Sequence, residues 1–363
     1  MGAFRPRSIR GGPTTLSNMR KSLIQILIIA IVVGGIFYLH GKKEEKAAAI
    51  RFNCTEEKAN NFDCYRSYYS NMVKNNSVAD AFEDLKSRYE KSDYVSSQCH
   101  QIVHVIGFEA SKKWRTVTQA YKEGDSFCWS GYYHGVLEGI ANQNGYKNFV
   151  KNINEICKPL AETRRYSFDH YNCVHGLGHG IMALKDDELF QSLDICDGLN
   201  DSWERTSCWS GAFMENVMMD SRYHTAKYLK PEDPLYPCNA VGKQYKETCY
   251  LMQTSYILTV VNSNFSKVFE LCSGIEPEYR NICYQSLGRD ASGRSTSNVK
   301  QTVETCYLGK NYDQRANCII GAVKDFISYL HSDTRAKELC AALDDKNLQD
   351  VCMSTAESYY NNL

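Results

Sequence analysis

The residues that could carry chemistry in this chain are histidines placed one helical turn apart. Three segments pair a histidine with a second ligand-type residue at i and i+4, and the pairs are His100/His104, His134/Glu138 and His175/His179. Residues with this spacing share one face of a helix, with Cβ atoms about 5–6 Å apart, which suits two ligands of one metal ion. Imidazole and carboxylate ligands without a free thiolate favour a divalent transition metal, namely Zn, Fe, Mn or Cu.

Two of these histidines occupy the same position of a repeated template. The motif C-x2-G-x2-H-G occurs at Cys128 and Cys173, so that His134 and His179 each follow their cysteine by six residues. Equivalent positions of stacked helices lie side by side, about 8–10 Å apart between axes. We therefore predict that the pairs converge on one metal site. The predicted primary ligands are His104, His134 and His179, and the alternates or second-metal ligands are His100, His175 and Glu138.

A second hypothesis explains the same residues by packing. A histidine on an apolar helix is often a hydrogen-bonded core residue, and glycines in a repeat are often close-packing positions. His40 and His331 lie outside the template and are predicted to have no ligand role. The chain contains no phosphate-binding loop, so no nucleotide cofactor is expected.

The elements that must position these residues are indicated by sixteen cysteines. From Cys238 to Cys340 one series advances by 34 residues each time, and from Cys249 to Cys352 a second series advances by 34 or 35. A fixed period in this range is typical of stacked helical hairpins. The predicted fold is therefore all-α, an α-solenoid of disulfide-linked helical hairpins with a period of about 34 residues.

The intervals also predict which cysteines pair, because the short intervals are the nearly constant ones. The predicted bridges are Cys54–Cys64, Cys99–Cys128, Cys157–Cys173, Cys196–Cys208, Cys238–Cys249, Cys272–Cys283, Cys306–Cys318 and Cys340–Cys352. Pairing within one hairpin is the alternative that sequence leaves open. An even count of regularly spaced cysteines indicates a disulfide framework and an oxidising compartment. In period and cysteine placement the chain resembles helical repeats of the tetratricopeptide kind, a resemblance that implies a fold and no function.

The N-terminal region predicts a single-pass membrane protein. Residues 1–21 form a basic tail, residues 22–39 an uncharged apolar run of transmembrane length, and residues 40–52 a charged stalk. The basic residues before the run predict a cytoplasmic N-terminus and an extracytoplasmic C-terminal domain, in the periplasm, at the cell surface or in the secretory lumen. A cleaved signal peptide is the alternative. The remaining residues, 53–363, form the cysteine-rich domain, with a histidine-rich half at 95–225 and a histidine-poor half at 226–363.

Two functions from different classes fit this sequence. The first is a membrane-anchored metalloprotein with a His/Glu cluster, which would be a hydrolase or an oxidoreductase if it is an enzyme. The second is a non-catalytic scaffold whose concave face binds a protein or glycan partner. The chain balances 42 basic against 42 acidic residues, which disfavours a nucleic-acid partner.

Overall fold

Every regular element in the described part of the chain is helical. The computed structural model describes residues 52–361 except 115, 129, 165–166, 219–226 and 296–297, and these residues form nineteen α-helices, one 3-10 helix and no strand. The longer helices are α2 Phe62–Asn75, α3 Val78–Tyr89, α5 Cys99–Lys113, α7 Gly131–Asn144, α11 Phe168–Leu184, α13 Ser202–Val217, α14 Lys243–Val260, α16 Pro277–Arg294, α18 Tyr312–Leu330 and α20 Lys346–Asn361. The all-α prediction is confirmed.

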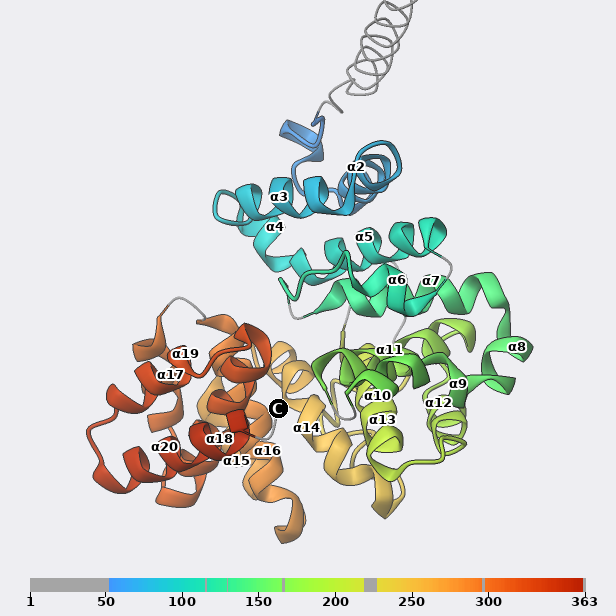
Figure 1. The fold of residues 1–363 in the computed structure, drawn as a ribbon. Coiled ribbons are helices and arrows are strands. Elements are labelled where there is room, and N and C mark those ends of the chain that lie inside the picture. The colour runs from blue at the N-terminus through green and yellow to red at the C-terminus, as the bar shows by residue number, and fades with distance from the viewer. Residues whose placement is uncertain are drawn as a thin grey trace, which may run out of the picture. The chain divides into compact units, whose positions relative to one another are not determined.

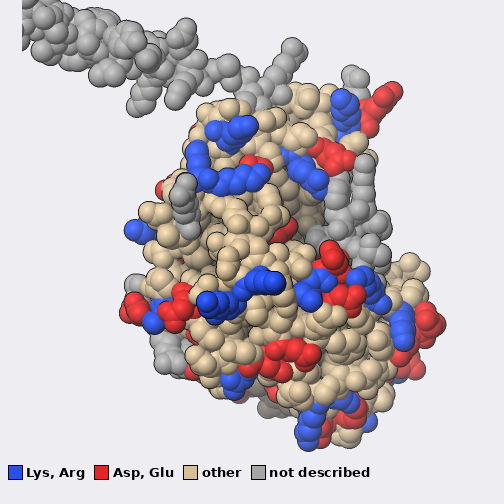
Figure 2. Space-filling view, turned by 90° about the vertical axis from the view of Figure 1, so that its right-hand side faces the viewer, with Lys and Arg blue, Asp and Glu red and all other residues tan. Residues whose placement is uncertain are grey.

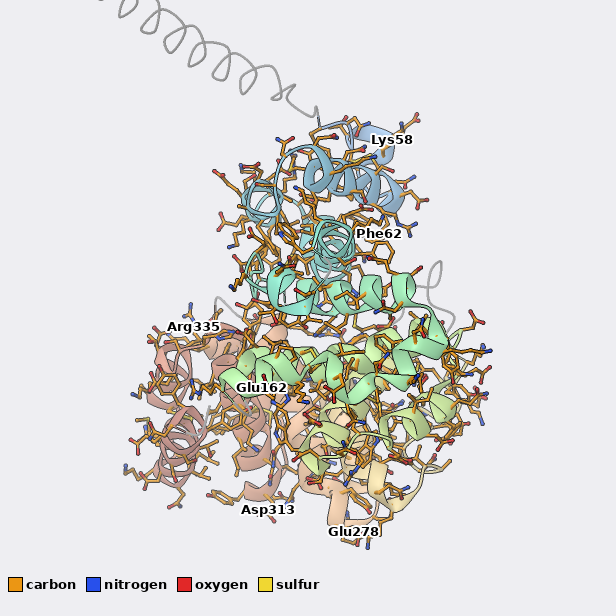
Figure 3. All side chains as sticks on the ribbon, turned by 45° about the vertical axis from the view of Figure 1, so that its right-hand side comes forward. Lys58, Phe62, Glu162, Glu278, Asp313 and Arg335 are labelled. Carbon is orange, nitrogen blue, oxygen red and sulfur yellow. A yellow bond between two sulfur atoms is a disulfide. The ribbon has the colours of Figure 1, made fainter. Side chains whose placement is uncertain are left out.

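Shorter helices connect the long ones. They are η1 Glu56–Lys58, α4 Asp93–Ser97, α6 Val117–Tyr121, α8 Tyr146–Lys151, α9 Ile153–Ile156, α10 Lys158–Thr163, α12 Leu189–Cys196, α15 Phe265–Ser273, α17 Val299–Tyr307 and α19 Thr334–Ala341. From α5 onward, each long helix packs against the next long helix along the chain, from α5 and α7 to α18 and α20 (Figure 1). Side chains fill the spaces between neighbouring helices (Figure 3).

The helices that carry the histidines begin at residues suited to capping. The Ser167 side chain accepts a hydrogen bond from the backbone of His170 at the start of α11, and Asp201 accepts from Trp203 at the start of α13. Such caps satisfy backbone N–H groups that have no partner within the helix. Because of these caps, α11 and α13 begin five and six residues before Cys173 and Cys208. The cysteines therefore lie within the first two turns of these helices, and the sequence expectation that they open the helices is wrong there.

All sixteen cysteines lie in disulfide-bonded pairs. The pairs are Cys54–Cys64, Cys99–Cys128, Cys157–Cys173, Cys196–Cys208, Cys238–Cys249, Cys272–Cys283, Cys306–Cys318 and Cys340–Cys352, with Cα atoms 5.4 to 5.7 Å apart. Four of the bridges join the end of a short helix, α12, α15, α17 or α19, to the long helix that follows it. The disulfide framework is confirmed, and the alternative pairing within one hairpin does not occur.

Glycines bring the backbones of the histidine-bearing helices into contact. A Cβ atom at Gly135 of α7 would lie 2.1 Å from the carbonyl oxygen of His104 on α5. On the next pair of helices, a Cβ atom at Gly211 of α13 would lie 1.9 Å from the carbonyl oxygen of His175 on α11. Real Cβ atoms do not approach backbone oxygen this closely. The glycines therefore set the distance between the helices that hold the site.

Replacing Gly135 by alanine should destabilise the protein. Overpacking a close contact costs typically about 1–3 kcal/mol, and this cost opposes the gain of about 1 kcal/mol that alanine brings inside a helix. The midpoint of urea unfolding should fall. Gly274→Ala is the matched control, because a Cβ atom there meets only Leu271 oxygen, at 3.4 Å, and its midpoint should stay the same or rise. Equal midpoints for the two variants would contradict the close-contact interpretation.

The two halves of the domain meet through the end of α18. The Tyr329 hydroxyl accepts a hydrogen bond of 3.2 Å from the backbone N–H of Cys128, just before α7. The His331 ring packs edge-on against Phe168 at the start of α11, with ring centroids 3.7 Å apart. His331 thus has the packing role that the sequence predicts. Residues of the histidine-poor half therefore contact the loop and helix that border the histidines.

The predicted N-terminal segments lie outside the described residues. Residues 1–51 form a unit separate from residues 52–363, and the basic tail, the apolar run 22–39 and all but residue 52 of the stalk belong to the first unit. Within the part of the chain that the structure describes, no helix combines the length and apolar character needed to cross a membrane. The membrane anchor stays a prediction.

Candidate metal centre

Five histidines from three successive long helices meet in the interior. His100 and His104 come from α5, His134 from α7, and His175 and His179 from α11. The His134 ring lies between the two pairs, with ring centroids 5.4 Å from those of His100 and His104 and 4.8 and 4.3 Å from those of His175 and His179. One ring nitrogen of each residue falls into one of two groups, His100/His104/His134 and His134/His175/His179, within which these atoms lie at most 4.8 Å apart.

Burial keeps these imidazoles neutral. His134, His175 and His179 expose 2% or less of their surface, and His104 is also buried. Burial lowers the pKa of His100, His134 and His175 well below the ordinary histidine value, and it lowers the pKa of His179 against the opposing effect of Glu215. A neutral imidazole carries one bare nitrogen, whose lone pair is available to a metal ion.

The hydrogen bonds of His175 and His179 fix which nitrogen is bare. His179 Nδ1 lies 2.5 Å from the Glu215 carboxylate, which only accepts hydrogen bonds, so Nδ1 carries the hydrogen. His175 Nδ1 lies 2.7 Å from the Ser210 hydroxyl. Because that hydroxyl donates to the Ser207 carbonyl at 2.7 Å, it accepts from His175 Nδ1. Both residues therefore present a bare Nε2.

The other pair is held in a similar way by groups on and before α7. His100 Nδ1 donates to the Cys128 carbonyl at 2.8 Å, which leaves its Nε2 bare. His104 Nδ1 lies 3.7 Å from the Glu138 carboxylate, a position that favours the hydrogen on Nδ1. The Cys128 carbonyl is presented by a loop in which Cys128 and Ser130 have φ values of +58° and +59°. Non-glycine residues adopt this left-handed region at a cost, and such residues cluster at functional sites.

Within each pair the two Nε2 atoms face each other. The separation is 3.0 Å between His100 and His104 and 3.2 Å between His175 and His179. In the second pair neither Nε2 has a hydrogen to donate, so the contact joins two lone pairs and is not a hydrogen bond. Two nitrogen ligands about 2.0–2.1 Å from one ion, at bond angles between square and tetrahedral, are about 2.9–3.4 Å apart. Both pairs therefore have the spacing of a metal chelate.

His134 completes the cluster from the centre. Its ring stacks on that of His179, with an interplanar angle of 15°. Its Nδ1 is buried and has no hydrogen-bond partner. A buried polar atom without a partner is uncommon and requires an explanation, of which an unseen ion is one. The position of His134 next to both pairs makes it a shared ligand candidate.

The structure brings together five of the six residues that the sequence selects as ligands. The sixth, Glu138, lies outside both nitrogen groups and beside the outer edge of His104. His170 instead pairs with Glu204 on α13, at 3.0 Å. His40 and His224 lie outside the described residues.

The sequence did not reveal two of the groups that orient the pairs, the Cys128 carbonyl and the Ser210 hydroxyl. The only local signal is that Cys128 and Cys208 both begin a CWSG motif, and Ser210 is the serine of the second copy. A backbone carbonyl has no residue type to mark it. These groups could be found only from the fold.

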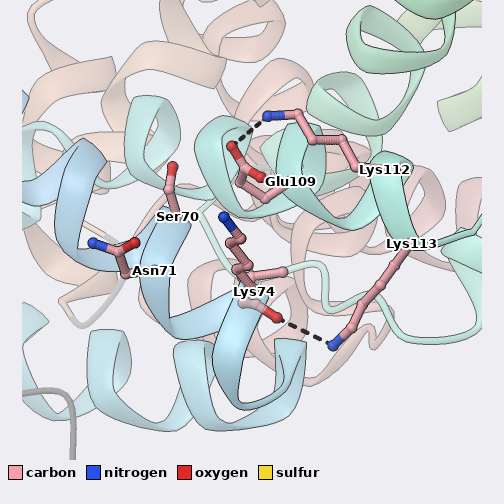
Figure 4. A pocket seen from close by; sticks show the side chains of 7 residues that line it. Ser70, Asn71, Lys74, Glu109, Lys112 and Lys113 are labelled. Atoms are coloured by element: carbon pink, nitrogen blue, oxygen red, sulfur yellow. Dashed lines mark hydrogen bonds and ion pairs between the residues drawn. The ribbon is translucent and has the colours of Figure 1, made fainter.

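A surface pocket of about 400 Å³ lies away from the histidines, between α2 and α5 (Figure 4). Of the three lysines that line it, Lys112 pairs with Glu109 at 2.6 Å and Lys113 donates to the backbone oxygens of Val73 and Asn76. These contacts occupy much of its polar lining, and nothing links it to the cluster. On the face shown in Figure 2, acidic and basic side chains are interspersed over uncharged surface.

Comparisons with protein-family models, with curated proteins and with solved structures find no match to this chain. The function therefore has to be argued from the site itself.

Proposed function

We propose that this protein binds transition-metal ions at the five-histidine cluster. The observation that carries the proposal is the contact between the Nε2 atoms of His175 and His179. Both Nδ1 hydrogens are engaged by Ser210 and Glu215, so two lone pairs face each other 3.2 Å apart in the interior. A cation between them replaces repulsion with two coordinate bonds. Outer partners that fix the tautomer and orientation of histidine are typical of metal ligands.

The donor set narrows the choice of metal. The groups that face inward are imidazole nitrogens, and the carboxylates of Glu138 and Glu215 lie behind the rings. Imidazole suits Zn, Cu and Fe, whereas Mn prefers oxygen ligands. Zn, Cu or Fe is therefore the proposed ion, and an open coordination position would allow a metal-dependent hydrolase or oxidoreductase.

We also propose the setting of the site. The row of long helices is an α-solenoid of units of about 34 residues, behind an N-terminal transmembrane anchor. The eight disulfides support an extracytoplasmic, oxidising location. The apolar run 22–39 and the basic residues before it support the anchor and its orientation.

Purified full-length protein that has never met a chelator should contain stoichiometric metal by elemental analysis. After chelation, adding Zn²⁺ back should raise the melting temperature, because an ion bound only by the folded state stabilises that state. His134→Ala and His179→Ala should each reduce the metal content, whereas His331→Ala should not. Protein without metal, and without a shift from added Zn, Fe, Mn or Cu, would refute the proposal and favour the non-catalytic scaffold.

A further inference from the structure

We infer that the cluster is a two-ion centre, with one ion held by His100 and His104, a second by His175 and His179, and His134 within ligand distance of both. This inference depends on the proposed metal binding and specifies the number of ions and the ligands of each. Its first support is the division of the ligand nitrogens into two groups of three. Among the described residues, neither group includes a nitrogen from the other pair, and His134 is common to both.

The second support is that the fold builds the same half-site twice. In each half-site, one long helix supplies an HxxxH pair, and the next long helix with its preceding loop supplies the outer partners. For the α5 pair these partners are the Cys128 carbonyl and the Glu138 carboxylate. For the α11 pair they are the Ser210 hydroxyl and the Glu215 carboxylate, both on α13. Each half-site is complete without the other.

The third support is charge. Two divalent cations close together repel each other, and nearby carboxylates offset that repulsion. Each half-site has one carboxylate behind its pair, Glu138 at 3.7 Å from His104 and Glu215 at 2.5 Å from His179. One carboxylate per pair is the arrangement expected for one ion per pair.

The fourth support is the position of His134. Its ring lies within 5.4 Å of all four other rings, centroid to centroid. Its Nδ1 is buried without a partner, so this nitrogen is open to an ion. A single ion at one pair would leave the facing Nε2 atoms of the other pair uncoordinated, at 3.0 or 3.2 Å.

Equilibrium dialysis of full-length protein against Zn²⁺, followed by elemental analysis, tests the inference by counting. The wild type should retain two ions per chain. The double variants His100→Ala/His104→Ala and His175→Ala/His179→Ala should each retain one, and the fourfold variant none. His170→Ala, which removes a buried histidine of α11 outside the cluster, should retain two. Helical circular dichroism verifies that each variant is folded.

The outcomes separate this inference from the broader proposal. One ion in the wild type overturns the two-ion centre and leaves metal binding intact. Loss of all metal in either folded double variant also overturns it, because both pairs would then serve one ion. Two ions retained in both double variants would place the metal elsewhere. Zero ions in the wild type refutes metal binding itself. The count in the wild type decides the matter even if a variant does not fold.

Discussion

Complete reduction of the eight disulfides should unfold the protein at 25 °C without denaturant. Seven of the bridges span sequence separations of 10 to 16 residues, and a bridge that closes such a loop contributes about 3 kcal/mol in the chain-entropy account. Eight such contributions exceed the ~5–15 kcal/mol by which a typical domain is stable. The helical signal in far-ultraviolet circular dichroism should therefore collapse as sixteen thiols become titratable.

The matched control removes one bridge at the end of the domain. Cys340→Ala/Cys352→Ala eliminates the link between α19 and α20 and should leave a folded protein that is less stable by about 3 kcal/mol. Both measurements are made on chelator-treated protein, so that metal bound by free thiols does not obscure the result. A fully reduced protein that still melts cooperatively would show that helix packing alone is sufficient for folding.

Replacing Glu215 by glutamine should weaken metal binding 10- to 100-fold. The Glu215 carboxylate lies 2.5 Å from His179 Nδ1 and is buried, with 6% of its surface exposed. It fixes the hydrogen on Nδ1 and makes Nε2 a better donor. Loss of such a partner typically costs metal affinity by about this factor. Competition with a chromophoric chelator measures the dissociation constant for Zn²⁺, and the stabilisation by saturating Zn²⁺ should fall by about 1.4–2.7 kcal/mol.

Glu204→Gln is the control for this prediction. Glu204 also pairs with a buried histidine of α11 from a position on α13, since its carboxylate lies 3.0 Å from His170 Nε2. His170 is outside both nitrogen groups, so the affinity for Zn²⁺ should not change. If the two variants lose affinity equally, the effect is a general loosening of the α11–α13 contact and not the orientation of a ligand.

The disulfides and the candidate site are parts of one design. Cys99 precedes His100 directly, and its partner Cys128 supplies the carbonyl that orients the same histidine. Cys208 stands two residues before Ser210, which orients His175. Each of these bridges fixes a helix turn that carries a ligand or its hydrogen-bond partner. Rigid support of this kind holds ligands in place before the metal binds.

The sequence by itself determined the features that depend on local spacing. The period of the cysteines indicated helical hairpins, and the short intervals indicated the pairs that the structure contains, because neighbouring helix ends are within reach of a disulfide. The i,i+4 spacing placed His100 with His104 and His175 with His179 on single helix faces, since that relation needs only helical geometry.

Only the tertiary structure decided which groups meet across helices. The sequence gave Glu138 a ligand role, whereas the α5–α7 contact sets its carboxylate behind His104. The helix spacing depends on backbone contacts at Gly135 and Gly211, which a sequence pattern does not measure. The Cys128 carbonyl depends on a loop with left-handed residues, and Tyr329 reaches that loop from 201 positions along the chain. Side-chain direction across an interface follows from the packing of whole helices, and local residue spacing does not contain that information.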